Sequence, residues 1–316
     1  MAIRTKYPQD RGLTARMLTT VFLLGLLYAV FVTALVLAHV QLGFIIVIGL
    51  AILFVQYFYS DKIALYSMGG KIVTREQQPQ LHAIVDRLCA MANMPKPQVA
   101  LSQSDIPNAF ATGRNQKHAV VCATTGLLRR LNEPEVEAVL SHELSHVAHR
   151  DVAVMTIASF LGILSGLLVR MLMFAGLFGG MGGRGRRGGF GGQGGGQVAL
   201  VELGAIVFSA IIYAISFILI RTLSRYRELA ADRSGAILIG QPALLAQALV
   251  KVSGEMSRIP TQDLRAAEHF NAFFFAPAIA PGASLSSLFA THPSLQKRLD
   301  QLAKLDAEMH RGVAAS

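Results

Sequence analysis

The sequence has no tryptophan, only two cysteines and few charged residues for its length. Charged side chains make up 15% of the 316 residues and hydrophobic ones 53%, which is too apolar a balance for an ordinary soluble domain. Cys89 and Cys122 do not form a C-x-x-C pair; the first lies on the apolar face of an expected helix and the second in an apolar strand. We therefore expect two buried free thiols in a reducing compartment, without a disulfide or a metal role.

Charge is absent altogether from two stretches near the N-terminus, residues 17–38 and 42–59, which only three residues separate. Each is long enough, or nearly so, to cross a hydrocarbon core of about 30 Å. Two further apolar runs cover residues 152–178 and 203–220. We predict four membrane-embedded helices. A cleaved signal peptide explains the first run poorly, because no A-x-A site is present and a second apolar run follows at once.

Basic residues flank the first two runs on the sides away from the loop between them: Arg4, Lys6, Arg11 and Arg16 before, and Lys62, Lys71 and Arg75 after. The positive-inside rule then places both ends of this hairpin in the cytoplasm. The net charge of +10 fits a protein that lies against an anionic inner leaflet. Nucleic acid is not an expected partner, because the basic residues flank apolar spans and are not interleaved with aromatic ones.

The loop at residues 179–197 conflicts with this scheme, because it holds Arg184, Arg186 and Arg187 among many glycines. Either the third and fourth runs cross fully despite these arginines, or they form a hairpin that enters the membrane without crossing it. Arg170, inside the third run, favours polar or wet surroundings there. We expect this Gly/Arg-rich loop to be disordered, since it cannot bury enough surface to offset its chain entropy.

The segment His142-Glu143-Leu144-Ser145-His146 has the pattern H-E-x-x-H. In a helix, positions i and i+4 share a face, so His142 and His146 can present two imidazoles to one metal ion, with Glu143 beside them as a base. These are the ligand pair and general base of a zinc peptidase.

A helix is well supported here. Asn132 is a good N-cap, Pro134 lies in the first turn, and Glu135 completes a capping-box pattern. An apolar stripe at helical spacing follows: Val136, Val139, Leu140 and Val147. Nothing in the sequence breaks this helix before Asp151.

The remaining pattern predicts helices at residues 78–94, 224–253 and 294–309, and strands at 98–102, 108–112 and 118–123, the last two joined by a hairpin. The expected fold class is an α+β membrane protein, with four membrane-embedded helices and a mainly helical, zincin-like cytoplasmic peptidase domain that contains a small β-sheet. The expected division is residues 1–60, an N-terminal transmembrane hairpin; 61–151, the first part of the peptidase domain; 152–220, a second hairpin; and 221–316, the second part of the peptidase domain.

A catalytic zinc ion takes three protein ligands. His149 is a poor third ligand, because seven residues of helical rise separate it from His142 by about 10 Å. Glu228 is the better candidate. Asp232 lies on the same helical face, four residues on, where its carboxylate can orient a ligand histidine.

Four ordered motifs together resemble the M48 family of membrane metallopeptidases: residues 142–146 with Asp151, residues 224–228 with Ala231 and Asp232, residues 108–110, and residues 291–293 with Arg298. The similarity covers nearly the whole chain and is greatest to the bacterial heat-shock branch. It implies one Zn²⁺ per chain, endoproteolysis at the cytoplasmic face and removal of misfolded membrane proteins. The long Gly/Arg-rich loop departs from the family's usual short connection.

This resemblance assigns roles to individual residues. His142, His146 and Glu228 would bind zinc, while Glu143 would deprotonate the zinc-bound water and later protonate the leaving amine.

The resemblance also places Asn108 on a strand edge, where a substrate backbone could pair by β-addition. It suggests that His292 and Arg298 donate to the oxyanion or to the peptide. For His292, a capping or surface histidine is the alternative.

The predicted function is thus that of an integral-membrane zinc metalloendopeptidase of the bacterial inner membrane that cleaves misfolded or damaged membrane proteins during stress. Its expected partners are unfolded or membrane-protein substrates and the lipid bilayer, with other membrane proteases or further copies of the chain as candidates. An enzyme that clips lipidated C-termini would need more spans, and an intramembrane protease would carry the motif within a span. The main non-enzyme alternative is an inactive scaffold or chaperone, against which the intact Glu143 counts.

Overall fold

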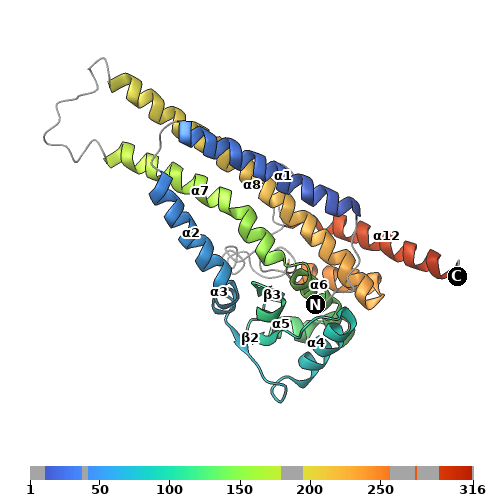
Figure 1. Ribbon diagram of the computed structural model, residues 1–316. Helices are drawn as coiled ribbons and strands as arrows, with labels where there is room; N and C mark the ends of the chain where they lie inside the picture. The colour runs from blue at the N-terminus through green and yellow to red at the C-terminus, as the bar shows by residue number, and fades with distance from the viewer. Residues whose placement is uncertain (1–10, 38–41, 179–194, 257–274, 276–291, 315–316) are drawn as a thin grey trace. The chain divides into compact units, whose positions relative to one another are not determined.

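The computed structural model describes residues 11–37, 42–178, 195–256, 275 and 292–314 (Figure 1). The chain divides into two compact units, which we describe separately. The sheet unit comprises Met1–Met17, Val55–Met155 and Arg221–Ser316, and the helix unit comprises Leu18–Phe54 and Thr156–Ile220.

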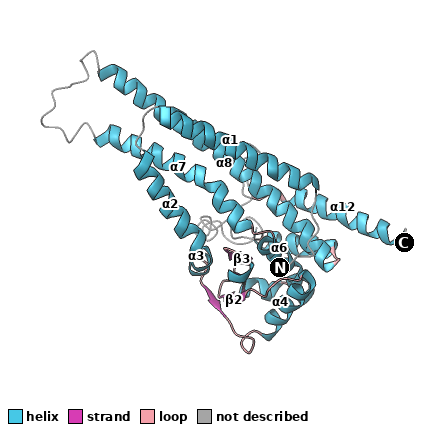
Figure 2. Cartoon of the chain, in the orientation of Figure 1, coloured by secondary structure: helices cyan, strands magenta, loops and turns pink. Residues whose placement is uncertain are grey.

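Helices account for most of the described chain (Figure 2). They are α1 (Arg11–Leu37), α2 (Leu42–Phe58), α3 (Ser60–Ser67), α4 (Pro79–Ala92), α5 (Thr125–Arg130), α6 (Glu133–Ala148), α7 (Asp151–Phe178), α8 (Gly195–Ile239), α9 (Pro242–Met256) and α12 (Leu295–Ala314). The strands are β1 (Gly70–Ile72), β2 (Gln98–Ser102), β3 (Ala109–Gly113) and β4 (Ala119–Thr124), with a short 3₁₀ turn at Gln116–His118.

The helix unit consists of parts of α1, α2, α7 and α8, which meet through aromatic rings and small residues. Tyr28 of α1 lies 6.1 Å from Phe160 of α7, measured between ring centroids. A Cβ on Gly49 of α2 would come within 3.3 Å of the same Phe160 ring, and one on Gly166 of α7 within 3.4 Å of Tyr213 of α8. Glycines that allow such close approach are typical of helix contacts in membranes.

Large apolar side chains cover the outside of this unit; among them Phe22 is 68% exposed and Ile157 72% exposed. Such a surface suits lipid and not water. Two stretches, Gly12–Ala34 and Ile206–Ile239, are long and apolar enough to cross a membrane, and the number rises to four if two bent helix pairs each count as one span. Apart from Tyr59, the described residues of all four predicted apolar runs lie in helices, while four full crossings remain a prediction.

The sheet unit is built on a four-stranded sheet of order β1-β2-β4-β3, in which only the β2–β4 pair is parallel. One face packs on α3 through Ala100, Phe110 and Cys122. The other face packs on the main core, to which α4, α6 and α9 contribute. The sequence predicted three of these strands and missed β1, since three residues beginning with glycine show no alternation.

The predicted start of α6 is confirmed. Asn132 and Glu135 form a reciprocal capping box, with both hydrogen bonds at 3.0 Å. The helix ends at Ala148, because Arg150 adopts a left-handed conformation with φ 58°. The break therefore comes slightly earlier than expected, and α7 begins afresh at Asp151.

Two other expected boundaries were wrong. The helix predicted at residues 224–253 is interrupted at Gly240, whose φ of 69° is a conformation that glycine adopts without steric cost. Its first half is the end of α8 and its second half is α9. The predicted loop ended at residue 197, but α8 already begins at Gly195; the rest of that loop, residues 179–194, lies outside the described residues.

The backbones of α6 and α8 lie very close to each other where the metal-ligand motif begins. A Cβ on Gly235 would come within 2.8 Å of the His142 amide nitrogen. Two serines of α6 strengthen the contact: Ser141 donates to the carbonyl of Gly235 at 3.2 Å, and Ser145 donates to that of Ala231 at 3.3 Å. This packing places the predicted ligands of the two helices side by side.

Candidate metal centre

Three side chains predicted as metal ligands converge between α6 and α8. The Nε2 atoms of His142 and His146 are 3.3 Å apart. Glu228 brings one carboxylate oxygen to 3.4 Å from His146 Nε2 and the other to 3.7 Å from His142 Nε2. One ligand atom from each residue lies within 4.8 Å of the others, so the group could hold a metal ion.

The spacing of these atoms suits zinc. With zinc–nitrogen and zinc–oxygen bonds of about 2.0 to 2.2 Å, tetrahedral geometry separates ligand atoms by about 3.3 to 3.6 Å. The separation between the two histidine nitrogens, 3.3 Å, and that between His146 and one oxygen of Glu228, 3.4 Å, fall in that range. The 3.7 Å separation from His142 involves the other oxygen of Glu228. Two histidines and a glutamate are also a common donor set of catalytic zinc sites, which leave a fourth position open.

The first histidine is held by a buried chain of three side chains. His142 Nδ1 lies 2.9 Å from Asp232, as expected from the sequence. Arg298 donates from Nε and from one terminal nitrogen to the two oxygens of Asp232, at 2.7 and 2.6 Å. Arg298 and Asp232 are 1% and 0% exposed. The carboxylate therefore fixes the ring so that Nε2 is directed toward the other ligands.

The second histidine has a matching arrangement that the sequence did not suggest. His146 Nδ1 lies 2.5 Å from Asp151, the first residue of α7. Arg227 lies 2.6 Å from the same carboxylate and donates to the Asp151 carbonyl at 2.9 Å. Each ligand histidine is thus oriented by an aspartate that an arginine holds. Asp151 and Arg227 both belong to the sequence motifs named above. Only the folded structure shows that they contact each other.

We expect Asp151→Asn to weaken zinc binding by roughly 10- to 100-fold, because outer residues that orient ligand histidines typically contribute that much. An amide would still fill the space but would no longer favour a proton-donating Nδ1 as strongly. The measurement is a competition titration of the purified protein with a zinc chelator. Asp105→Asn, at a carboxylate whose side chain is 84% exposed, is the matched control and should leave the affinity unchanged. Equal zinc affinity in the wild type and in the two variants would rule out this role for Asp151.

Glu143, the predicted base, is buried against β3. Its side chain is 5% exposed, and one carboxylate oxygen accepts a hydrogen bond from the backbone N–H of Ala111 in β3 at 3.1 Å. Burial raises the pKa of Glu143 to about 8. Glu143 can therefore both accept and return a proton near neutral pH, which is what an acid–base residue needs.

The electrostatics around His146 favour positive charge. Burial opposes the charged imidazole, but Asp151 and Glu228 outweigh it and raise the pKa of His146 to about 10. Carboxylates that stabilise a proton on this ring would stabilise a metal cation in the same place.

Asn108 does not lie as predicted. Its backbone N–H donates to Thr124 Oγ1, and its carbonyl accepts from the Thr124 N–H, so both groups face β4 and not the outer edge of the sheet. Its side-chain oxygen accepts from the N–H of Phe275 at 2.9 Å, and the residue is fully buried. Asn108 thus holds another part of the chain, and the outer edge belongs to Ala111 and its alternate neighbours.

Arg298 has a supporting role that the sequence did not suggest. Its third nitrogen donates to the Phe275 carbonyl at 2.8 Å, so each of its three nitrogens has an acceptor within the protein. Its predicted contact with the oxyanion or the peptide stays a prediction. The Phe275 ring lies edge-on to His142 at 5.2 Å between centroids. Phe275 therefore supports the ligand, a role without any signal in the sequence around it. His292 Nδ1 lies 3.1 Å from Glu228, and its predicted contact with the oxyanion stays a prediction.

The other sequence candidates lie apart from this group. His149 caps the end of α6 and is 3.5 Å from Ser234, outside the three-ligand cluster. Cys89 and Cys122 are buried and form no disulfide, as predicted. Burial raises the pKa of Cys89 to about 11 and that of Cys122 to about 12, so both remain neutral thiols. Arg184, Arg186 and Arg187 lie outside the described residues.

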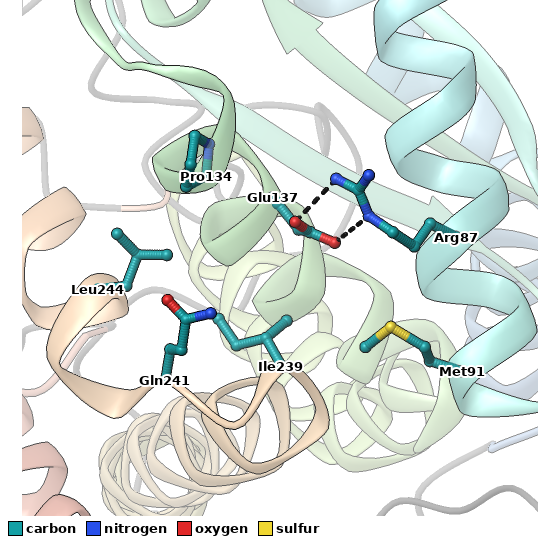
Figure 3. Close-up of a pocket in the computed structure, with 7 residues that line it drawn as sticks. All are labelled: Arg87, Met91, Pro134, Glu137, Ile239, Gln241 and Leu244. Carbon is teal, nitrogen blue, oxygen red and sulfur yellow. Dashed lines mark hydrogen bonds and ion pairs between the residues drawn. The ribbon is translucent and has the colours of Figure 1, made fainter.

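A pocket of about 410 Å³ lies elsewhere in the sheet unit and is crossed by the Arg87–Glu137 ion pair (Figure 3). Its lining comes from α4, α6, α9, the end of α8 and the turn between α8 and α9: Arg87, Met91, Pro134, Glu137, Ile239, Gln241 and Leu244. None of the three ligand residues lines it. Its two charged side chains already pair with each other, which makes this pocket a poor candidate for a second metal site.

The chain matches known proteins along most of its length. A model of peptidase family M48 matches residues 75–306, which include all the candidate site residues. The chain belongs to peptidase family M48. Among its M48 relatives, Protease HtpX homolog 1 of Streptomyces coelicolor is 54% identical over 313 residues, which are 99% of each chain.

Two more M48 relatives show how widely the similarity extends. Protease HtpX homolog 2 of Methanosarcina mazei is 50% identical over 97% of this chain and 100% of its own. The Protease HtpX homolog of Moorella thermoacetica is 49% identical over 97% of this chain and 99% of its own. The predicted resemblance is confirmed: this M48 chain is a protease, similar to HtpX along nearly its whole length.

The fold of this M48 chain is similar to that in the crystal structure of S. mikatae Ste24p, with a TM-score of 0.52 and 15% identity over 93% of this chain and 67% of the other. At that identity the likeness concerns the fold alone. Together with the apolar surface of the helix unit, the relatives identify the chain as a membrane protein.

Proposed function

We propose that this M48 protease is a zinc-dependent endopeptidase that cleaves misfolded or damaged membrane proteins at the cytoplasmic face of the membrane. The observation that carries the zinc assignment is the convergence of His142, His146 and Glu228 at separations suited to a tetrahedral ion. Aspartates orient both histidines, which is the usual support of a catalytic zinc site.

The position of each residue suggests its role in catalysis. When bound, zinc would supply a Lewis acid that polarises the scissile carbonyl and makes water a better nucleophile. Glu143, buried beside the ligands and held by Ala111, takes the proton of the attacking water and returns it to the leaving amine. His292, next to Glu228 and 6% exposed, would donate to the oxyanion.

The substrate would bind as an extended polypeptide along β3. This strand is at the edge of the sheet. Asn108 bonds to Thr124 of β4, so by the antiparallel alternation residues 110 and 112 also bond to β4, while Ala111 and Gly113 direct their backbone groups outward. Ala111 lies directly beside the base. Pairing through the backbone needs no particular side chain, which favours unfolded or damaged polypeptides over one defined sequence.

The test is metal-dependent cleavage by the purified full-length protein. We expect one zinc per chain, loss of casein cleavage after chelation, and recovery on adding Zn²⁺ but not Mg²⁺, which prefers six oxygen ligands. Cleavage that persists after all metal has been removed would contradict the proposal.

The proposed orientation places both termini, residues 60–150 and the chain after residue 220 in the cytoplasm, because Lys and Arg flank those sides of the first hairpin. An even number of crossings between residues 151 and 221 then returns Glu228 to the side of His142. Single cysteines at positions 75, 186 and 300, in a cysteine-free background, can be tested in intact cells with an impermeant maleimide.

Positions 75 and 300 should stay unlabelled in this experiment, and position 186 should be labelled if the second hairpin crosses fully, as we expect. Protection at 186 would instead indicate a re-entrant hairpin. Labelling at 75 would contradict the whole orientation.

A further inference from the structure

One face of α3 is apolar and exposed, although α3 belongs to the sheet unit. The opposite face is buried: Ala64 has no exposed surface and packs with Phe110 and Cys122 of the sheet. On the outer face, Ile63 is 46% exposed and Tyr66 91% exposed. A short surface helix in water would place polar residues there, so an apolar outer face requires a different surrounding.

Basic side chains accompany the aromatic residues around this face. Lys62 Nζ lies 5.5 Å from the ring centroid of Tyr59, and the guanidinium carbon of Arg114 lies 5.5 Å from that of Phe58. Phe58 and Tyr59 are 40% and 46% exposed. Amphipathic aromatic rings with basic side chains beside them are typical of the boundary between acyl chains and headgroups.

The position of α3 in the sequence, directly after an apolar helix, indicates what covers this face. The apolar helix α2 ends at Phe58, and α3 begins two residues later at Ser60. With 17 residues, α2 spans about 25 Å, most of a hydrocarbon core of about 30 Å. If α2 is embedded in the membrane, the residues that follow it have to lie in the headgroup layer. A protein partner would need to compete with the bilayer for the same residues.

We propose that α3 is an interfacial helix whose outer face inserts at the headgroup–acyl boundary of an anionic bilayer. This outer face consists of Lys62, Ile63 and Tyr66 of α3, together with Phe58 and Tyr59 just before it and Arg114 beside it. The apolar side chains enter the acyl region, while Lys62 and Arg114 extend to lipid phosphates.

The position of α3 bears on proteolysis through β3. The inner face of α3 packs on Phe110, and the next residue, Ala111, holds the base Glu143. A membrane-bound α3 therefore keeps the edge strand and the base near the interface, where a damaged membrane protein leaves the bilayer. This consequence depends on the proposed function, but insertion of α3 itself does not.

The absence of tryptophan makes a direct test simple. Tyr66→Trp introduces a single fluorophore at a position so exposed that folding should be unaffected. In full-length protein reconstituted into phosphatidylglycerol vesicles, Trp emission should shift to shorter wavelength. Lipids brominated just below the headgroup should quench it, and aqueous iodide should not. Gln247→Trp, on the exposed side of α9 in the same unit, is the matched control and should show emission typical of water.

Three outcomes decide whether α3 inserts into an anionic bilayer. Water-like emission at position 66, equal to that of the control, would overturn the proposal. A blue shift without quenching by brominated lipids would also overturn it, in favour of a second copy or another protein on this face. Adding Lys62→Glu to Tyr66→Trp should reduce the lipid quenching more in phosphatidylglycerol than in phosphatidylcholine vesicles. An equal effect in the two lipids would contradict the anionic preference.

Cleavage assays separate this proposal from the proposed function. Tyr66→Asp should slow cleavage of a membrane-inserted substrate while leaving casein cleavage and zinc content unchanged, because Tyr66 is not part of the metal centre. Gln247→Asp should change neither rate. If wild-type protein cleaves neither substrate, the proposed function fails, whereas the fluorescence result stands independently.

Discussion

Glu143→Gln is expected to lower the rate of peptide cleavage by roughly 100- to 10,000-fold, the usual cost of losing a general base. The amide cannot take a proton from water at neutral pH. The fold should not change, since the glutamine oxygen can still accept the hydrogen bond of the Ala111 N–H. Zinc content should not change either, because Glu143 is not one of the three converging residues.

The measurement is a single-turnover cleavage rate with zinc analysis on the same sample. Glu137→Gln is a matched control on the same helix: Glu137 pairs with Arg87 away from the ligands, so its loss should leave the rate close to that of the wild type. A Glu143→Gln protein that carries zinc and turns over at the wild-type rate would show that another group is the base.

The metal centre was the most predictable part of this protein because it depends on local geometry. The i and i+4 spacing alone brought His142 and His146 onto one face, and the same spacing related Glu228 to Asp232. Helical rise argued against His149 as a ligand in the same way. The sequence did not show the contact that joins the two helices, which depends on the close approach at Gly235.

The supporting residues were predicted less well, because their partners are distant in the sequence. Asn108 and Arg298 were assigned to the substrate, yet both bind the backbone of Phe275, and Arg298 holds Asp232. A buried arginine needs a carboxylate partner, and only the fold shows which carboxylate is within reach. Asp151 is the same case: its role depends on the left-handed turn that ends α6.

In the fold, long and periodic elements were predicted and short or interrupted ones were not. The apolar runs and the capped helix α6 carry many consistent signals along the chain. Strand β1 is three residues long and is a strand only because it pairs with β2. The break at Gly240 was visible as a glycine, but a single glycine within a helical pattern does not by itself end a helix.

Glu228→Ala is expected to remove zinc from the purified protein and to abolish cleavage, whereas His149→Ala should retain both. Loss of a direct ligand leaves only two, so affinity should fall by more than the roughly 10- to 100-fold expected for an orienting residue such as Asp151. The fold should survive, since Ser141 and Ser145 still join α6 to α8. Circular dichroism should confirm this before metal analysis and casein cleavage are measured. His149 is the matched comparison, because it lies near the same motif but is not one of the three converging residues. If His149→Ala lost zinc and Glu228→Ala kept it, the third ligand would be His149 and not a residue of α8.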